Sequence, residues 1–204
     1  MTPRATALSP LPLPRLVLVA DSSATKGWPL AQVVAQAVAA GVRAVWLREK
    51  QASARRRREL ARLLVDLLRN EGGVLIASPG PGAELADAVQ LGRGDQRADG
   101  SVTGRSCHTK AELEEAAAEG SSWAMLSPIF SSASKPGYGP PLGAEALSDT
   151  PLPTWALGGV GEANARACLE AGAAGVAVMG AVLAAPEPAQ AVRAILASLE
   201  GALV

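Results

Sequence analysis

The stretch TWALGGVGEANARACLEAGAAGVAVMG, residues 154–180, decides the fold of this chain. Two short apolar runs, at 154–158 and 175–179, flank an Ala- and Glu-rich segment at 162–171. Nearly continuous apolar runs are typical of strands buried on both faces of a parallel sheet. The segment between them is long enough for a helix that returns the chain to the same edge of the sheet. The stretch therefore predicts a strand–helix–strand unit with parallel strands.

The same pattern extends over the rest of the chain. Six further apolar runs precede this unit, at 15–20, 43–47, 74–77, 88–91, 102–106 and 123–127. Amphipathic helical segments are clearest at 29–40, 54–70, 109–119 and 186–200, and AEL at 83–85 makes at most one turn. Eight such units predict an α/β fold, a single (β/α)8 TIM barrel with eight parallel strands. The alternative is a doubly wound open sheet. That fold normally carries a Gly-rich phosphate turn after its first strand, where this sequence reads ADSSATKGW at 20–28.

Composition excludes several classes of protein. Of the 204 residues, 49% are hydrophobic and 19% are charged, which argues against a disordered chain. Nineteen basic residues balance nineteen acidic ones, so we expect neither a nucleic acid nor a membrane surface as partner. Two cysteines and one histidine are too few for a disulfide scaffold or a Cys/His metal site, and we expect a reduced, cytoplasmic location.

The N-terminal region predicts a leader segment. Pro10, Pro12 and Pro14 interrupt its apolar character, which argues against a signal-peptide helix. We expect residues 1–14 to be a flexible leader and residues 15–204 to form one barrel domain.

Candidate functional residues lie just after the predicted strands, because barrel enzymes place their active sites at the carboxyl ends of the strands. In WLREK at 46–50, Trp46, Arg48 and Lys50 alternate and should share a direction. The two cations could hold a phosphate or diphosphate, or could be an ordinary charged strand end.

The fourth and fifth strands lead to two further candidates. Asp95 follows the fourth strand and is either a ligand for Mg²⁺ or a turn residue. His108 precedes a capping box formed by Thr109 and Glu112, and has either a structural or a chemical role.

The last three strand ends predict a phosphate site. After the sixth strand comes the longest stretch without periodicity, where Ser132, Ser134 and Lys135 suit phosphate oxygens. Gly158 and Gly159 follow the seventh strand, and Met179 and Gly180 follow the eighth. Glycines on these loops let backbone N–H groups approach a phosphate.

Six segments occur together in a recognisable order and spacing: WLREK (46–50), DAVQLGRGD (87–95), GRSCHTKAEL (104–113), SPIFSSASKPGYGPPLG (127–143), ALGGVGEANA (156–165) and AGAAGVAVMGAVL (171–183). Together they resemble the thiamine phosphate synthase and TenI superfamily, whose fold is a (β/α)8 barrel. The synthase joins a pyrimidine methyl diphosphate to a thiazole phosphate with Mg²⁺ and releases pyrophosphate. Some TenI members tautomerise the thiazole phosphate.

The resemblance implies a role for most of the candidate residues. Arg48, Lys50 and Lys135 would contact the diphosphate, and Ser106 would contact the pyrimidine. Ser132 and Ser134 stand where the synthase has a T-x-T loop. Gly159, Met179 and Gly180 match the thiazole-phosphate site.

The sequence also departs from the family at positions that matter for chemistry. Trp46 stands where the synthase has Gln, so we expect the indole to fill part of the pyrimidine site. Ala77 and Ser78 replace an Asn-Asp pair, which leaves Asp95 as the one remaining carboxylate for Mg²⁺ and makes that cofactor doubtful. Pro128 stands where some TenI members have a histidine, so His108 and Cys107 remain as candidates for proton transfer.

Three functions therefore stay open. The first is a TenI-like protein that binds a thiazole phosphate or thiamine phosphate and acts as a thiazole tautomerase. The second is a divergent Mg²⁺-dependent thiamine phosphate synthase, and the third is a non-catalytic, ligand-binding or regulatory homologue. The candidate catalytic residues are His108, Lys135 and Arg48. We expect a small phosphorylated thiazole or pyrimidine ligand. Because members of the family often self-associate, the resemblance also implies a homodimer.

Overall fold

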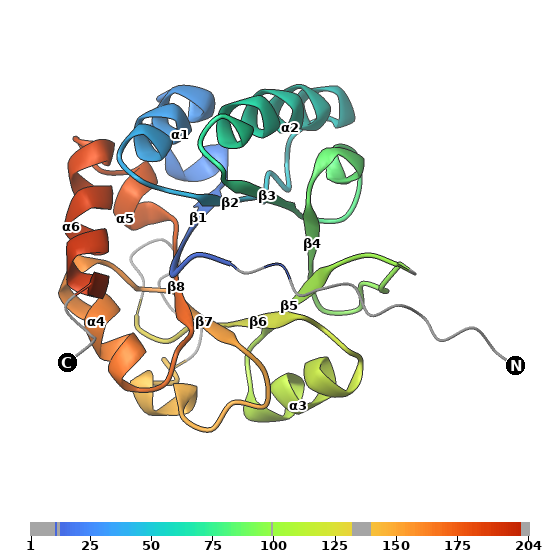
Figure 1. Ribbon diagram of the computed structural model, residues 1–204, viewed down its shortest axis with the longest axis vertical. Helices are drawn as coiled ribbons and strands as arrows, with labels where there is room; N and C mark the ends of the chain where they lie inside the picture. Colours follow the sequence, from blue (N-terminus) through green and yellow to red (C-terminus); the bar gives the residue numbers. More distant parts are fainter. Residues whose placement is uncertain (1–10, 12, 99, 132–139, 201–204) are drawn as a thin grey trace, which may run out of the picture.

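Eight parallel strands form a closed barrel in the computed structural model, which describes residues 11, 13–98, 100–131 and 140–200 (Figure 1). The strands follow the chain in order: β1 (Leu16–Ala20), β2 (Ala44–Leu47), β3 (Val74–Ala77), β4 (Ala88–Leu91), β5 (Thr103–Cys107), β6 (Trp123–Leu126), β7 (Thr154–Leu157) and β8 (Gly175–Val178). The ring closes where Leu18 of β1 pairs with Val178 of β8. The predicted barrel is confirmed, and the alternative of an open sheet is wrong.

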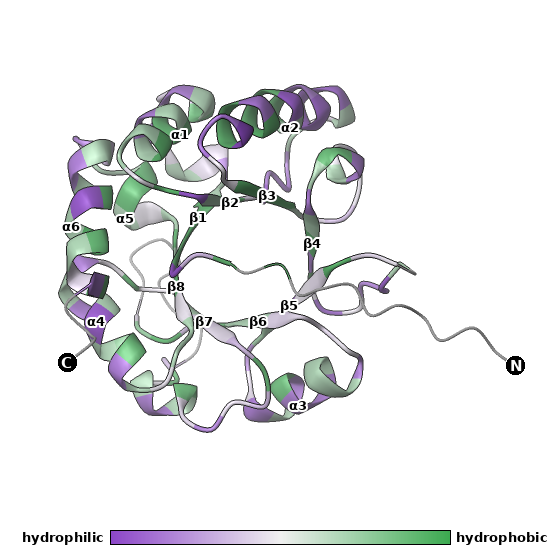
Figure 2. Cartoon of the chain, viewed as in Figure 1, coloured by the Kyte–Doolittle hydropathy of each residue, from purple (hydrophilic) through white to green (hydrophobic). Residues whose placement is uncertain are grey.

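The helices surround the barrel at the predicted places. They are α1 (Leu30–Ala39), α2 (Ala54–Arg69), α3 (Lys110–Ala118), α4 (Glu162–Glu170), α5 (Gly180–Leu183) and α6 (Pro188–Glu200), with short 3₁₀ turns η1 (Ser22–Ala24), η2 (Ala83–Leu85) and η3 (Ala144–Leu147). The sequence did not predict α5. Figure 2 shows β3 hydrophobic throughout and α2 mixed, as expected for a strand buried on both faces and a helix with one exposed face.

The capping signals act where the sequence predicted helix starts. The Ser53 hydroxyl accepts a hydrogen bond from the Arg56 amide and begins α2. The Thr109 hydroxyl accepts from the Glu112 amide and begins α3. The Glu112 carboxylate accepts from the amide of His108, so the predicted capping box fixes His108 in front of the helix.

Three tryptophans fill the interior of the barrel. Trp46, Trp123 and Trp155 pack there with aliphatic side chains from every second strand position. A Cβ at Gly104 would overlap the indole of Trp123, and a Cβ at Gly175 would overlap that of Trp155. These two glycines therefore make room for the indoles.

The chain before β1 packs across the end of the barrel where the strands begin (Figure 1). Leu11 and Leu13 contact the interior cluster, and the indole of Trp155 donates to the carbonyl of Pro14 over 3.0 Å. Arg15 donates to the carbonyl of Leu199 near the end of α6. The opposite end, where the strands finish, is called the mouth below.

The barrel wall is least covered around β4. β3 and β4 pair through two residues each, whereas β1 and β2 pair through four. The 3₁₀ turn η2 stands in place of a helix between β3 and β4, and the described residues between β4 and β5 form no helix. None of the helices in the described parts of the chain is long and apolar enough to cross a membrane.

Candidate functional site at the barrel mouth

Pairs of polar side chains from neighbouring strand ends meet at the mouth. These pairs form because side chains alternate along each strand, so that every second residue, up to the strand end, points toward the barrel axis. The pairs are Asp21 with Arg48, Trp46 with Ser78, Gln90 with Ser106, and His108 with Ser127. The mouth is therefore lined by side chains whose positions are set by hydrogen bonds between strands.

Arg48, a predicted diphosphate ligand, is paired with Asp21. One terminal nitrogen of its guanidinium lies 2.7 Å from Oδ2 of Asp21, while the other carboxylate oxygen accepts from the amide and hydroxyl of Ser23. Burial acts to raise the pKa of Asp21. The hydrogen bonds from Ser23 and the pairing with Arg48 outweigh it, so the pKa of this carboxyl lies below its ordinary value. Lys50 is exposed and forms no ion pair with any described residue.

Trp46 forms part of the floor of the mouth. Its side chain belongs to the interior cluster and is 5% exposed, and its indole N–H donates to the hydroxyl of Ser78 over 3.0 Å. Ser78 therefore faces the axis. Alternation then places Ala77 on the helix side of β3 with Leu75, so Ala77 does not line the mouth.

Ser106 is held by a buried amide. Gln90, which is 1% exposed, donates to the hydroxyl of Ser106 over 3.1 Å and accepts from the indole of Trp123 over 2.8 Å. The hydrogen bond from the indole fixes which end of the amide is the donor. Ser106 thus lies at the mouth, and the ligand contact that the family resemblance implies for it stays a prediction.

His108 reaches across from β5 to the end of β6. Its Nδ1 lies 2.7 Å from the carbonyl oxygen of Ser127 and 3.3 Å from the Ser127 hydroxyl. A carbonyl oxygen only accepts, so Nδ1 carries the proton, and in the neutral imidazole the lone pair is then on Nε2. The ring is oriented by the backbone of the neighbouring strand.

Cys107 takes no part in the mouth. It is fully buried on the helix side of β5, where its thiol contacts the carbonyl of Glu112. Burial, together with the charge of Glu112, raises the pKa of this thiol to about 12. Of the two candidates for proton transfer, His108 alone remains.

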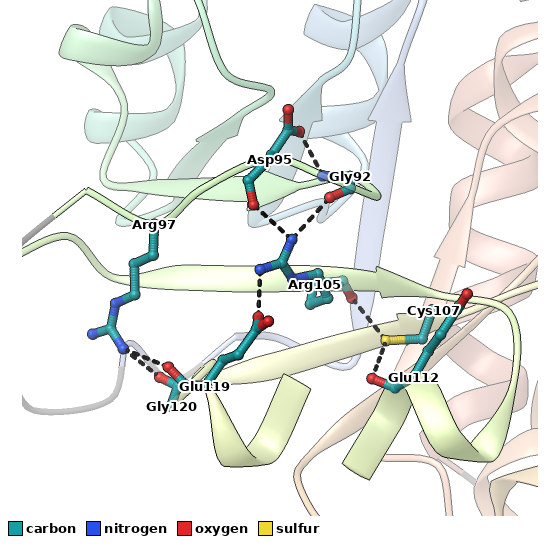
Figure 3. A network of polar contacts seen from close by, with 8 residues as sticks. All are labelled: Gly92, Asp95, Arg97, Arg105, Cys107, Glu112, Glu119 and Gly120. Atoms are coloured by element: carbon teal, nitrogen blue, oxygen red, sulfur yellow. Dashed lines mark hydrogen bonds and ion pairs between the residues drawn. The ribbon is translucent and has the colours of Figure 1, made fainter. Parts of the chain in front are cut away.

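Asp95 closes a turn, and the turn is clamped from outside the barrel by Arg105 (Figure 3). One carboxylate oxygen of Asp95 accepts from the amide of Gly92 over 2.7 Å. A single guanidinium nitrogen of Arg105 donates to the carbonyls of both Gly92 and Asp95, each over 2.9 Å. The other terminal nitrogen of Arg105 pairs with Glu119 after α3.

These residues do not fit a resident magnesium ion. Mg²⁺ takes an octahedral set of oxygens, with carboxylates as its usual protein ligands. Asp95 is exposed with one oxygen committed to Gly92, and Ser78 is engaged by Trp46. The described parts of the chain hold no group of three or more His, Cys, Asp or Glu side chains that could bind a metal.

The loops after β7 and β8 carry the predicted phosphate-binding glycines. Gly158 and Gly159 have φ of +88° and +67°, and a Cβ at Gly159 would meet the backbone of Phe130 and Ser131. Glycine is required there because the loop lies against the segment after β6. A Cβ at Gly161 would lie 3.6 Å from that of Ala181, so the two loops are in contact.

Two backbone amides on these loops have no acceptor among the described residues. Among the described residues, the N–H groups of Gly159 and Gly180 donate to no protein atom, and a Cβ at Gly180 would find open space within 4 Å. Met179 lies between the interior cluster and this loop. The predicted residues Ser132, Ser134 and Lys135 lie outside the described residues.

Sequence reasoning missed four residues that organise the mouth: Asp21, Gln90, Ser127 and Asn164. Asn164 accepts from the amide of Gly161 and donates to the carbonyl of Gly159, which shapes the turn after β7. Asp21 could have been found, because it follows Val17 and Val19 on the inward face of the first strand.

Comparison with known proteins gives a consistent result. The family described as thiamine monophosphate synthase matches residues 16–182. A Geobacter sulfurreducens protein named provisionally as a thiamine-phosphate synthase is 38% identical over 199 residues, with 90% of this chain and 93% of the relative covered. A thiamine-phosphate synthase of Roseiflexus castenholzii is 32% identical over 206 residues, covering 92% and 90%. The solved thiamine phosphate pyrophosphorylase of Pyrococcus furiosus superimposes with a TM-score of 0.82 at 25% identity, covering 93% of this chain and 97% of that one.

Proposed function

We propose, from the premise that this chain belongs to the thiamine monophosphate synthase family, that it binds a phosphorylated thiazole at the barrel mouth and interconverts tautomers of that ring. The observation that carries the proposal is that, within the part of the chain that the structure describes, the amides of Gly159 and Gly180 on adjoining loops donate to no protein atom. Backbone N–H groups without acceptors favour an anion, and phosphate oxygens suit them.

The floor of the mouth supports a ligand with one ring. The indole of Trp46 occupies the space between the ends of β2 and β3 and holds the hydroxyl of Ser78. An indole offers one donor and no acceptor, so this side of the mouth has little with which to read a polar pyrimidine. A thiazole bound with its phosphate on the β7 and β8 loops does not need that side.

His108 is the group that we assign to proton transfer. Moving a proton between ring positions needs one group that can both give and take it near neutral pH, and imidazole does so. With Nδ1 donating to the Ser127 carbonyl, Nε2 is the nitrogen that accepts the proton from one ring atom and returns it to another. The carbonyl of Ser127 also stabilises the imidazolium formed between the two steps.

The test separates binding from turnover. Calorimetric titration of thiazole phosphate measures binding, and proton NMR in D₂O follows exchange at the thiazole ring. We expect the unmodified protein to bind and to exchange, and His108→Gln to bind with similar affinity but not to exchange. Absence of binding by the unmodified protein would refute the proposal.

The second candidate is a divergent thiamine phosphate synthase. It is favoured by the identity with the Geobacter and Roseiflexus relatives over nine-tenths of the chain. Arg48 at the mouth also suits the diphosphate of a pyrimidine substrate. An assay of the condensation of pyrimidine diphosphate with thiazole phosphate, monitored by the pyrophosphate released, decides between the tautomerase and the synthase. A turnover of about 1 per second or more would favour the synthase.

A further inference from the structure

The segments after β1 and β2 are joined by two carboxylates, one from each segment, and each accepts hydrogen bonds from the other segment. Asp21, after β1, accepts from Arg48, after β2, while Glu49 accepts from the amide and the hydroxyl of Ser22 over 2.7 and 3.0 Å. Asp21 and Glu49 are both buried, at 6% and 3% exposure. The two carboxylates act on different groups, because Asp21 contacts the guanidinium whereas Glu49 holds the loop that begins η1.

The guanidinium of Arg48 is engaged on one side only. A guanidinium has five N–H groups. Among the described residues, its sole hydrogen-bond acceptor is Asp21. The side chain of Arg48 is 22% exposed and that of Asp21 is 8% exposed, so a ligand entering the mouth meets the cation before the carboxylate.

A cleft borders the carboxylate side of this arrangement. The cleft, of about 450 Å³, lies between the loops after β1 and β2 and is lined by Asp21, Ser23, Glu49 and the exposed Trp28, among others. Among the described residues, the polar contact that orients the guanidinium of Arg48 is its hydrogen bond to Asp21, and the carboxylate of Asp21 is in turn held by Ser23. An arginine fixed before its ligand arrives loses less side-chain freedom on binding.

We propose that Asp21 is a positioning residue that aims the guanidinium of Arg48 into the mouth, where it binds a diphosphate group on the β2 side, apart from the loops that carry Gly159 and Gly180. The inference goes beyond the proposed function and does not depend on it. Asp21 does not touch the ligand; it acts through Arg48.

The experiment is a calorimetric titration of inorganic pyrophosphate, and separately of thiazole phosphate, into the full chain. Asp21→Asn should weaken pyrophosphate binding about tenfold, the lower end of the loss seen when a metal-ligating side chain loses its orienting partner. Arg48→Lys should weaken it at least as much. The double variant should bind no more weakly than Arg48→Lys alone, because the carboxylate acts only through the arginine.

Two variants guard against a loss of fold. Ser23→Ala changes an exposed residue and leaves both charges, and it should weaken pyrophosphate binding by a smaller factor in the same direction. Glu49→Gln is the matched control, because it neutralises the adjacent carboxylate that does not contact the guanidinium. It should lower the thermal midpoint without changing the affinity for pyrophosphate.

The outcomes separate this inference from the proposed function. Unchanged or tighter pyrophosphate binding by Asp21→Asn, additive losses in the double variant, or no pyrophosphate binding by the unmodified protein would each overturn the role of Asp21. Failure to bind thiazole phosphate, with pyrophosphate binding and its dependence on Asp21 intact, would overturn the proposed function and leave this inference standing.

Discussion

The indole N–H of Trp46 donates to the hydroxyl of Ser78 over 3.0 Å, and this hydrogen bond joins the ends of β2 and β3 at the mouth. The resemblance drawn from the sequence marks both positions as departures, Trp for Gln and Ser for Asp. In the structure they are one unit, since each side chain is the other's partner. Replacing Trp46 or Ser78 alone leaves the other side chain without its hydrogen-bond partner.

Trp46→Gln should therefore open the pyrimidine side of the mouth only in part. We expect it to bind pyrimidine diphosphate more tightly than the unmodified protein does, because a short amide replaces the indole and can both donate and accept. Calorimetry with pyrimidine diphosphate checks this. Trp46→Phe is the control, since it removes the N–H but keeps most of the ring, and it should not gain affinity.

Ser78→Asp should restore magnesium binding only together with Trp46→Gln. In the single variant the new carboxylate lies within reach of the indole N–H, which competes for it. We expect Mg²⁺ with pyrophosphate to bind weakly to the unmodified protein and to Ser78→Asp, and more tightly to the double variant. Equal gains in the single and double variants would contradict the coupling.

Gly180→Asp should abolish binding of thiazole phosphate. The position has open space around a Cβ, so the change adds charge without steric conflict, and the carboxylate repels the phosphate. Ala197→Asp adds the same charge on the exposed part of α6 near the other end of the barrel and should bind normally. Retained affinity in Gly180→Asp would place the anion elsewhere.

The Asp21–Arg48 pair should make stability depend on acid pH. The pKa of Asp21 is lowered in the folded chain, so its contribution is present above the unfolded value of about 3.9 and is lost as pH falls through the folded value. Denaturant unfolding of the unmodified protein and of Asp21→Asn should give a constant difference above about pH 5 that shrinks below about pH 4. A difference that grows toward acid pH would contradict this sign.

Gly104→Ala should destabilise the barrel by about 1–3 kcal/mol or more, because the added methyl meets the indole of Trp123 in a filled interior. Thermal unfolding measures the loss. Gly180→Ala is the control, since open space receives its methyl and little change is expected.

Much of the fold could be predicted because apolar runs and helical periodicity are local properties of the chain. The α5 helix was missed because four residues are too few to show a period. The partners of Arg48 and Trp46 were missed for a different reason. Each hydrogen bond joins residues about thirty positions apart, and it forms because two strands have a particular register. Alternation predicts which way a side chain points, but it does not predict what it meets.

The short pairing of β3 with β4 has a consequence for how the ring comes apart. These strands share two residue pairs, and no full helix covers the connections on either side of β4 among the described residues. Backbone amides there should exchange with deuterium sooner than those between β1 and β2, which share four residue pairs. The barrel would then unfold first between β3 and β4. The loops after β7 and β8, on the opposite side of the ring, would keep their native structure longest.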